Sequence, residues 1–408
     1  MKIVIIEKEE SLKVGGIIIH NQRLANFLRH QGHDVKIIRF TNEESKDRNL
    51  ITIPYYLAEK RSFILLPLEN TRELLTRALK KIKPDVVHFC IGISPFDLFI
   101  PALCHSLNIP IVGIWHTDLA KERTSFELLA KSIYLAYLPV CKELDSLIVF
   151  TRRMKNFYVN KGLNKNRVKI IPNGVDSKLY SPGITTYKKK LALKNTVIFL
   201  GRLTLVKNPE LLIEAFRKAN VPQSKLLIVG TGDLESELKE KYAFDKRIIF
   251  TGLVKNEAKK IDLLRSANIF VLPSKNEGMS LSLLEAMSCS LATIVSDVGG
   301  SADIVGRTGI VLKEAHLENE LPVVIKILLD HPDFQKSLGK AARKRIIMKF
   351  NEEKTFTQYF ALYEKVVLSY HRFGPPEAFS QELYTNFNRK FKNLWEKAKD
   401  FSENYFLG

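Results

Sequence analysis

The sequence predicts an α/β protein made of two successive domains, each a doubly wound parallel β-sheet. The chain has 408 residues, which is enough for two or three domains of ordinary size. Short apolar runs rich in Val and Ile alternate with stretches of helical periodicity, which is the pattern of βαβ units. Two such series occur, and the turn-prone, lysine-rich stretch SPGITTYKKK (181–190) separates them.

The first series predicts the sheet of an N-terminal domain. KIVII (2–6) is a run of β-branched residues, and a Gly-Gly turn and an apolar helical period over 19–30 follow it. A second helical period spans 71–82. Further strands are expected where apolar runs recur, at 32–40, 84–89, 109–115, 145–150 and 168–173. Strands that alternate with helical patterns in this way pair in parallel.

The second series repeats the pattern and predicts a second sheet. Its strands are expected at 195–202, 225–230, 247–252, 268–274 and 292–297. The helices between them are expected at 209–219, 234–242, 258–267 and 281–288. Asn208 is expected to be the N-cap of the first of these helices, with Pro209 as its first residue. We therefore expect two Rossmann-like domains, over 1–180 and 181–355.

The C-terminal part is predicted to be helical. A helical pattern over about 352–370 ends at the G-P-P breaker at 374–376. Beyond it, Phe379, Leu383 and Phe387 begin an apolar series at three- and four-residue steps, which predicts an amphipathic helical tail within 373–408. Its acidic and basic residues cancel, so it lacks the cationic face of many interfacial helices. Packing onto the body of the protein is the simpler interpretation, and contact with a membrane or a partner is the alternative.

Cysteine content and hydropathy exclude several classes of protein. The four cysteines are far apart and include no C-x-x-C pair, which argues against a zinc ribbon or a disulfide scaffold and suits a reducing compartment. No run of about 18 apolar residues is present, so we expect no membrane span. The opening MKIVII is typical of a strand rather than a signal peptide. We expect a location in the cytoplasm or the plastid stroma.

The charge balance is strongly basic. The 63 Lys and Arg residues against 44 Asp and Glu give a net charge of +19. The stretch 151–170 holds seven basic residues and no acidic one. Such a surface attracts nucleic acid, anionic lipid headgroups or phosphorylated substrates, unless it is simply a solvated lysine-rich surface. Nucleic acid is disfavoured, because surface aromatic residues are not interleaved with the basic ones.

Two glutamates in NEGMSLSLLEAMS are candidate ligand-binding residues. Glu277 follows a predicted strand, and the residues after it, 278–280, lie at the start of the helix predicted at 281–288. The unpaired N–H groups of such a helix end suit an anionic or hydroxyl-rich ligand. Glu285 lies roughly 10 Å further along the helix axis. The two carboxylates could therefore hold the two ends of an elongated ligand, although this spacing also arises by chance on surface helices.

The segment FLGRLTLVKNPELLIEAF (199–216) supplies the opposite charge. Gly201 and Arg202 close a predicted strand, and Lys207 precedes a helix. An Arg and a Lys fixed at the carboxyl end of a parallel strand can hold a diphosphate without a metal, although both could be ordinary surface cations. No D-x-D motif is present, so we expect no metal site of that type.

The N-terminal domain offers glycines and a histidine. Gly15 and Gly16 follow the first strand and allow a ligand phosphate or sugar to approach the backbone. The absence of G-x-G-x-x-G disfavours a nicotinamide-dependent oxidoreductase. His116, in GIWHTD, lies at a strand end where open α/β sheets bind ligands, and we expect it to be functional. Structural roles are expected for His20, His88 and His105.

These segments together resemble the retaining nucleotide-sugar glycosyltransferases of family 4, which have the GT-B fold. The matching pieces follow in family order, namely GG, GIWHTD, IIPNGVD, FLGRLTLVKNPELLIEAF, LLIVGTGDLESEL, IIFTGLV and VLPSKNEGMSLSLLEAM running into SDVGG. The resemblance covers about residues 1–370 and leaves the tail outside. It implies two Rossmann-like domains facing an interdomain cleft, with a helix over 356–372 crossing back to the N-terminal domain.

The resemblance also implies roles for individual residues. Arg202 and Lys207 would neutralise the diphosphate, and Glu277 would contact hydroxyls of the transferred sugar. His116 would hydrogen-bond that sugar, and Glu285 would contact the ribose. The other donor-binding positions would be Gly15, Gly16, Gly201, Gly278, Met279, Ser280 and Leu281. Transfer would retain the anomeric configuration by front-face attack, with the leaving phosphate as base and without a metal or other cofactor.

The chain departs from the family pattern in two places. The family often has E-G-F-G where this chain has EGMS (277–280), which touches the sugar pocket. It often has Gly and Pro where this chain has Ser290 and Ala292, in a turn that should tolerate the change.

We therefore predict a metal-independent hexosyltransferase that uses a nucleotide diphosphate sugar, with a UDP-sugar favoured. The resemblance implies that the donor binds mainly to the C-terminal domain and the acceptor to the N-terminal one. The N-terminal domain is the more basic of the two, which favours a membrane glycolipid acceptor, such as a diacylglycerol glycolipid, and peripheral contact with an anionic membrane. The organisation of the chain resembles that of bacterial and plastid glycolipid synthases. Synthesis of polysaccharide or lipopolysaccharide precursors is the alternative within the class. A basic nucleotide- or nucleic-acid-binding protein is the alternative from another class.

Overall fold

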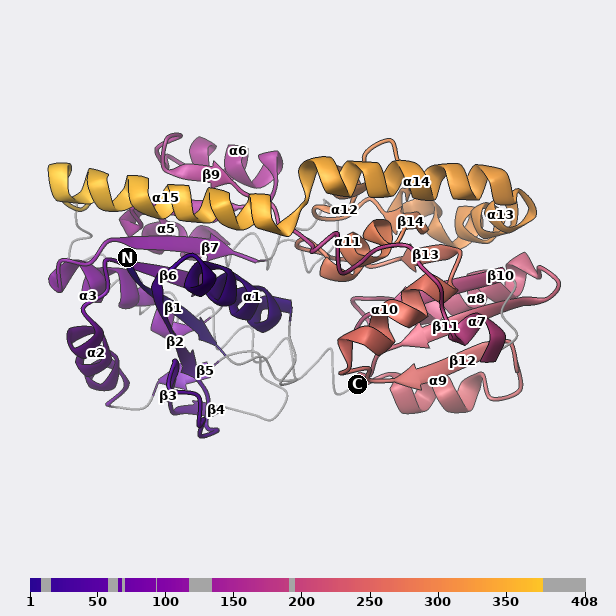
Figure 1. Ribbon diagram of the computed structural model, residues 1–408, viewed down its shortest axis with the longest axis horizontal. Coiled ribbons are helices and arrows are strands. Elements are labelled where there is room, and N and C mark those ends of the chain that lie inside the picture. Colours follow the sequence, from indigo (N-terminus) through magenta and orange to yellow (C-terminus); the bar gives the residue numbers. More distant parts are fainter. Residues whose placement is uncertain are drawn as a thin grey trace. The chain divides into compact units, whose positions relative to one another are not determined.

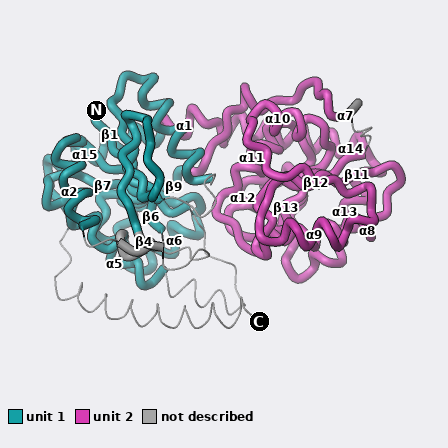
Figure 2. The backbone as a smooth tube through the Cα atoms, turned by 90° about the horizontal axis from the view of Figure 1, so that it is seen from below, with its two compact units in different colours: residues 1–116, 123–171, 358–408 teal, residues 117–122, 172–357 magenta. Residues whose placement is uncertain are grey.

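The computed structural model describes residues 1–8, 16–57, 65–67, 70–92, 94–116, 134–190 and 195–376. The chain divides into two compact units, which Figure 2 colours separately. Unit 1 draws on 1–116, 123–171 and 358–408, and unit 2 draws on 117–122 and 172–357. Each unit has its own parallel sheet with helices packed against it (Figure 1).

The sheet of unit 1 has seven strands among the described residues. Their order is β3-β2-β1-β6-β7-β8-β9, and all neighbours are parallel. The strands are β1 (Lys2–Lys8), β2 (Asp34–Phe40), β3 (Leu50–Ile53), β6 (Val86–Ile91), β7 (Ile111–Trp115), β8 (Ser146–Val149) and β9 (Val168–Ile170). A separate antiparallel pair consists of β4 (Tyr55–Leu57) and β5 (Leu65–Pro67). The chain order reverses at β1, so the carboxyl ends of β1 and β6 lie where such sheets bind ligands.

The central strand of this sheet explains why the apolar run at the N-terminus is continuous. In β1 the residues from Ile3 to Glu7 are buried, because β2 and β6 flank the strand and helices cover both faces. Helix α1 (Gly16–His30) buries Leu24 and Leu28, four residues apart, on the same side. The remaining helical elements are α2 (Thr71–Ile82), η1 (Pro95–Leu98), α3 (Ile100–Ser106), α5 (Leu138–Glu143), α6 (Arg152–Asn160) and α15 (Glu352–Phe373). Helix α15 begins in unit 2 and belongs to unit 1 from residue 358.

Unit 2 repeats this architecture. Its six described strands have the order β12-β11-β10-β13-β14-β15 and are all parallel. The strands are β10 (Asn195–Leu200), β11 (Ser224–Val229), β12 (Ile248–Gly252), β13 (Ile269–Leu272), β14 (Ala292–Ser296) and β15 (Ile310–Leu312). The helices are α7 (Tyr187–Lys190), α8 (Pro209–Ala219), α9 (Glu235–Lys241), α10 (Glu257–Ser266), α11 (Leu281–Ser288), α12 (Ser301–Val305), η2 (Glu314–His316), α13 (Leu317–Asp330) and α14 (Pro332–Lys349). The order reverses at β10, whose neighbours are β11 and β13.

The two doubly wound parallel sheets confirm the predicted α/β fold class. The tail beyond residue 376 and the glycine at 15 lie outside the described residues. Within the described part, no helix combines the length and the apolar character needed to cross a membrane.

Asn208 occupies the predicted N-cap position of α8, but in an unusual backbone conformation. Pro209 is the first residue of α8, as expected, but the Asn208 side chain makes no capping hydrogen bond. The backbone N–H groups of Lys207 and Asn208 both donate to Thr204 O, at 3.0 and 3.1 Å, and this turn leaves Asn208 at φ +53°. Asn tolerates that left-handed conformation better than most residues, whereas the side chain of an N-cap usually forms its hydrogen bond from an extended backbone.

The turn after α11 is also more constrained than expected. Ser290 has φ +65°, in the region that favours glycine. A Cβ added to Gly339 of α14 would lie 2.0 Å from Ser290 O, so α14 packs directly against this turn. The serine therefore carries a backbone cost of roughly 1 kcal/mol in a tightly packed place.

Candidate functional site

The loops after β10 and β13 form the candidate donor site of unit 2. These strands are neighbours at the point where the strand order reverses, so their loops leave the same edge of the sheet. The Lys275 N–H donates to Val206 O at 2.8 Å and holds the two loops together. The sequence prediction placed the cationic residues on the first of these loops and Glu277 on the second.

Lys207 and Glu277 are in direct contact. Lys207 Nζ lies 2.5 Å from Glu277 Oε1, and their side chains are 20% and 5% exposed. The Ser274 hydroxyl, which is buried, donates to the same carboxylate oxygen at 2.7 Å. The pairing of an acid and a base 70 residues apart builds a preformed polar centre at the sheet edge. Ser274 was not predicted as a site residue, although it is the last residue of the strand predicted at 268–274 and lies two residues after β13.

Backbone packing fixes the Glu277 loop from behind. Gly299 has φ +52°, and a Cβ added there would lie 1.7 Å from Glu277 O. The Gly300 N–H donates to Gly278 O at 2.9 Å. No residue other than glycine fits at 299 without displacing the Glu277 backbone. The SDVGG motif after β14 therefore supports the glutamate through its glycines.

The residues between Glu277 and α11 are tied into unit 2. Met279 is buried, and its Sδ and carbonyl oxygen accept hydrogen bonds from the backbone and side chain of Asn173, at 3.0 and 3.2 Å. Ser280 is the N-cap of α11, and its hydroxyl accepts from the Leu283 N–H at 3.3 Å. Leu281 opens the helix and is half-buried. Met279 therefore contacts the IIPNGVD segment and lies two residues after Glu277.

Glu285 has a partner that sequence analysis did not identify. Lys260 Nζ of α10 lies 2.7 Å from Glu285 Oε1, with side-chain exposures of 16% and 5%. The same ammonium lies 5.0 Å from the centre of the Tyr180 ring. Arg343 donates to Ser288 O at the end of α11 at 2.5 Å and so fixes the helix that carries Glu285. Nothing in the local sequence around Lys260 signals this contact.

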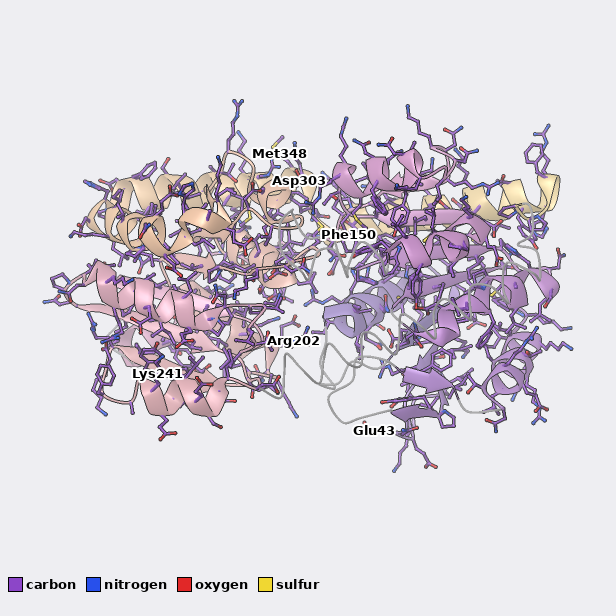
Figure 3. All side chains as sticks on the ribbon, turned by 180° about the vertical axis from the view of Figure 1, so that it is seen from behind. Glu43, Phe150, Arg202, Lys241, Asp303 and Met348 are labelled. Carbon is purple, nitrogen blue, oxygen red and sulfur yellow. The ribbon has the colours of Figure 1, made fainter. Side chains whose placement is uncertain are left out.

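Arg202 differs from the other predicted residues of unit 2 because it is exposed (Figure 3). It has no ion pair among the described residues. Gly201, beside it, is closely packed, since its carbonyl oxygen would lie 1.9 Å from a Cβ added to Gly230. The guanidinium that was predicted to hold the diphosphate is thus accessible and lies on a closely packed loop.

The predicted residues of the N-terminal domain lie in unit 1. His116 directly follows β7, its ring centre lies 5.7 Å from that of His20, and Gly16 opens α1. His20 in turn lies 5.6 Å from the ring of Tyr359 in α15. The His116 Nε2 atom is buried and has no hydrogen-bond partner within the described ranges. His116 is therefore placed by ring packing, with one ring nitrogen left for another partner.

His88 belongs to the same cluster. Its Nδ1 lies 2.7 Å from the hydroxyl of Tyr363. Burial is the main cause that lowers the pKa of His20 to about 4 and that of His88 to about 3, and neighbouring positive charge adds to it. Burial also lowers the pKa of His116 well below its usual value. The cluster is therefore neutral near neutral pH, in agreement with the structural role expected for His20 and His88.

This cluster predicts acid sensitivity. The unfolded chain binds protons on His20 and His88 near pH 6.5, whereas the folded protein does so only near pH 4 and 3. The contribution of these two histidines to the free energy of unfolding is therefore fully present above pH 6.5. It is lost as the pH falls through 4 and 3, by up to about 1.4 kcal/mol per pKa unit for each group. Urea unfolding at a series of pH values measures this slope. His20→Phe should flatten it, while His316→Gln, on an exposed residue, should leave it unchanged.

A buried charge pair also lies at the carboxyl end of β1 in unit 1. Lys8, the last residue of β1, forms an ion pair with Asp97 in η1, and the Gly92 N–H donates to Asp97 Oδ2 at 3.1 Å. Burial raises the pKa of Asp97 to about 6, against the opposing effect of Lys8. The sequence alone did not predict this pair. The available signal was two charged residues, Glu7 and Lys8, directly after the predicted apolar run at 2–6.

The arrangement in unit 2 can bind a ligand with both negative charge and hydroxyl groups. Lys207 and Arg202 offer cations, and Glu277 offers an acceptor for hydroxyl groups. Glu285, eight residues further along, offers a second acceptor. Such a set fits a sugar joined to a phosphorylated nucleoside better than a simple anion.

Two family models match the chain. The model described as "Glycosyltransferase Family 4" matches residues 14–179, and the one described as "Glycosyl transferases group 1" matches residues 184–345. The UDP-Gal:alpha-D-GlcNAc-diphosphoundecaprenol alpha-1,3-galactosyltransferase of Escherichia coli is 32% identical over 316 residues, which cover 72% of this chain and 79% of that protein. A sulfoquinovosyl transferase of Arabidopsis thaliana is 25% identical over 362 residues, which cover 83% of this chain and 68% of that protein.

Solved structures share the fold. The HepE protein of Anabaena in complex with UDP superposes with a TM-score of 0.74 at 17% identity, covering 90% of this chain and all of that one. A sucrose-phosphate synthase from Thermosynechococcus elongatus gives a TM-score of 0.71 at 22% identity, with the same coverage.

Proposed function

The chain belongs to the family 4, group 1 glycosyltransferases with the GT-B fold, and on this premise we propose that it transfers a hexose from a UDP-sugar to a membrane glycolipid acceptor with retention of configuration. The observation that carries the proposal is the contact between Lys207 and Glu277 at the edge of the unit 2 sheet. The E. coli relative is named for a UDP-Gal donor, and the HepE protein, which shares the fold, was solved with UDP bound.

In the proposed reaction, the bond between the anomeric carbon and the diphosphate oxygen breaks. A new bond forms on the same face between that carbon and an acceptor oxygen, and the acceptor proton passes to the departing phosphate oxygen. Lys207 and Arg202 stabilise the negative charge that grows on the diphosphate. Glu277 accepts hydrogen bonds from sugar hydroxyls and fixes the sugar for attack.

The resting ion pair gives Lys207 a defined starting position. An ammonium held 2.5 Å from Glu277 is already oriented before the donor arrives, so little side-chain entropy is lost on binding. When the diphosphate enters, the ammonium can serve both the phosphate and the carboxylate. Glu285, held by Lys260, contacts the ribose in this proposal.

Two observations support a lipid acceptor. The E. coli relative is named for an acceptor sugar on diphosphoundecaprenol, which is a polyprenol lipid. Unit 1 carries the basic stretch over 151–170, whose charge favours an anionic membrane surface. Peripheral contact with such a membrane would bring the acceptor to unit 1.

A donor panel tests the proposal. Radiolabelled UDP- and GDP-hexoses are incubated with the protein and a total lipid extract, and the label in the organic phase is counted. We expect transfer from a UDP-hexose into lipid. Transfer to soluble sugars but not to lipid would contradict the lipid acceptor, and the absence of turnover with every donor and acceptor would contradict the transferase activity. The anomeric configuration of the product, measured by NMR, tests retention.

Metal removal is expected to leave transfer unchanged. Lys207 and Arg202 supply the positive charge that a divalent cation provides in other glycosyltransferases. The rate is measured in excess EDTA and again after Mg²⁺ or Mn²⁺ is restored. A loss of rate in EDTA that the metal reverses would show that the two cations do not suffice.

A further inference from the structure

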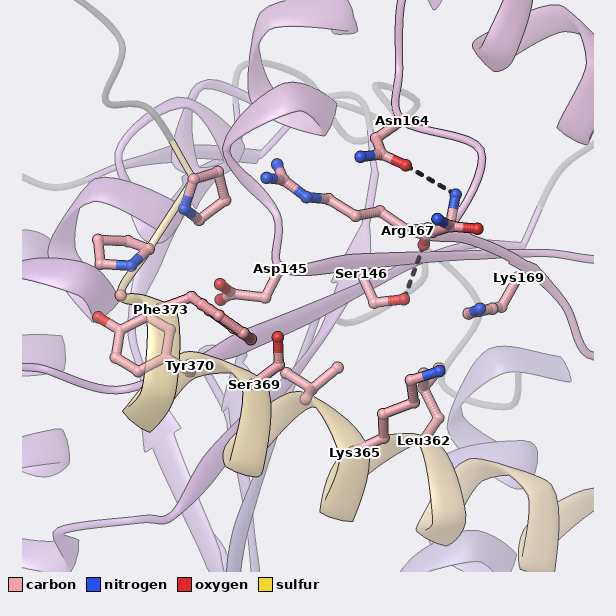
Figure 4. A pocket seen from close by; sticks show the side chains of 15 residues that line it. Asp145, Ser146, Asn164, Arg167, Lys169, Leu362, Lys365, Ser369, Tyr370 and Phe373 are labelled. Atoms are coloured by element: carbon pink, nitrogen blue, oxygen red, sulfur yellow. Dashed lines mark hydrogen bonds between the residues drawn. The ribbon is translucent and has the colours of Figure 1, made fainter.

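A surface pocket of unit 1 has the composition of an anion site (Figure 4). Its volume is about 570 Å³, and it lies between α15 and the segment that carries β8 and β9. None of its lining residues belongs to the clusters around Glu277 or His116. The basic side chains that line it are Arg167, Lys169 and Lys365.

These cations have few compensating charges. None of the three forms an ion pair within the described part of the chain. The one acidic residue of the lining, Asp145, already accepts a hydrogen bond from the Ile111 N–H at 2.7 Å and lies 3.1 Å from His105 Nε2. Its carboxylate is therefore engaged on the sheet side of the pocket.

The cations are also close enough to repel one another. Lys169 and Lys365 extend into the same space in Figure 4, from β9 and from α15. Burial, followed by the charges of Lys365 and Lys155, lowers the pKa of Lys169 below its usual value. A protein that holds like charges together in this way gains stability when an anion enters between them.

The rest of the lining suits a phosphate ester. Ser369 and the amides of Asn164 and Asn166 offer neutral hydrogen-bond donors beside the lysines. Phe373, which is 75% exposed, lies at the end of α15 and lines the pocket with two prolines at 375–376. The pocket therefore combines positive charge, amide and hydroxyl donors, and an apolar wall.

We propose that this pocket binds the phosphate group of a phosphorylated ligand, held by Lys169, Lys365 and Arg167. Such a phosphate could belong to a phospholipid headgroup or to a soluble phosphate ester, because both present the same oxygens to the lysines. The site is independent of the donor-binding cluster, and it would tie α15 to β9 when occupied.

The test compares the full-length protein with Lys169→Gln/Lys365→Gln and with the control Lys80→Gln/Lys81→Gln. The control removes the same charge from exposed positions of α2 in the same unit. One arm measures binding of inorganic phosphate and glycerol 3-phosphate by calorimetry. The other measures sedimentation with phosphatidylcholine vesicles that contain or lack phosphatidylglycerol.

We expect the pocket variant, and not the control, to lose about tenfold or more in affinity in one of the two arms. Loss in the calorimetric arm identifies a soluble ester, and loss in the vesicle arm identifies a lipid headgroup. The thermal midpoint without ligand should not fall in the pocket variant, since the substitution removes repulsion. Equal loss in both variants, unchanged binding in the pocket variant, or no binding by the wild type in either arm would overturn the proposal.

Discussion

Glu277→Gln is expected to reduce kcat by about 100-fold or more while the protein stays folded. Glutamine keeps the size of the side chain and an oxygen for the Ser274 hydroxyl, but it loses the negative charge that orients Lys207. Lys207→Ala is expected to reduce transfer at least as much, because it removes a cation from the leaving diphosphate. Steady-state kinetics with the preferred UDP-hexose measures both effects.

The two substitutions should differ in stability. Lys207→Ala leaves a 5% exposed carboxylate without its cation, which should cost about 1–3 kcal/mol of unfolding free energy. Glu277→Gln leaves an ammonium that water can reach, so its cost should be smaller. The control is Lys239→Ala, which breaks the surface pair between Lys239 and Glu235 in the same unit. Turnover retained by Glu277→Gln or Lys207→Ala, or a comparable loss in Lys239→Ala, would contradict the roles proposed here.

Gly299→Ala is expected to lower both stability and activity. Its Cβ would lie 1.7 Å from Glu277 O, so the loop that carries the glutamate must move. This clash adds to the strain of φ +52°. We therefore expect the free energy of unfolding to fall by at least about 2 kcal/mol and kcat to fall by about tenfold or more. Denaturant unfolding and the donor assay measure the two effects.

Gly252→Ala is the matched control for this substitution. Gly252 has φ +68°, but a Cβ there meets only Glu235 Oε1, at 3.9 Å. It therefore carries the strain of a left-handed conformation without the clash, and we expect a loss of about 1 kcal/mol and unchanged kcat. If both variants behave alike, backbone strain alone explains the effect, and Gly299 does not support Glu277.

The helices predicted with correct bounds share strong local signals. α2, α8 and α11 begin and end where their apolar periods do, over 71–82, 209–219 and 281–288. Pro209 fixes the start of α8, and the apolar stripe fixes the face that each helix buries. The central strands of both sheets were also predicted, because a strand buried on both faces is a continuous apolar run.

Elements with weaker local signals were not predicted. β3 (Leu50–Ile53) and β15 (Ile310–Leu312) are edge strands of four and three residues, too short to stand out from loops. α13 contains Pro322, which normally ends a helical pattern, although Leu321 and Ile325 beside it are fully buried. In each case tertiary packing stabilises an element that its own residues specify poorly.

The sequence by itself determined the fold class, the family, and the placement of Lys207 and Glu277 after buried strands and of Glu285 on a helix, because these depend on periodicity and on short motifs. Only the tertiary structure paired Lys207 with Glu277, Lys260 with Glu285, and Lys169 with Lys365. Each pair joins residues from different elements, and the register of parallel strands and the packing of helices decide which of them meet. A side-chain contact across 70 residues leaves no trace in either local segment, since each residue would look the same without its partner.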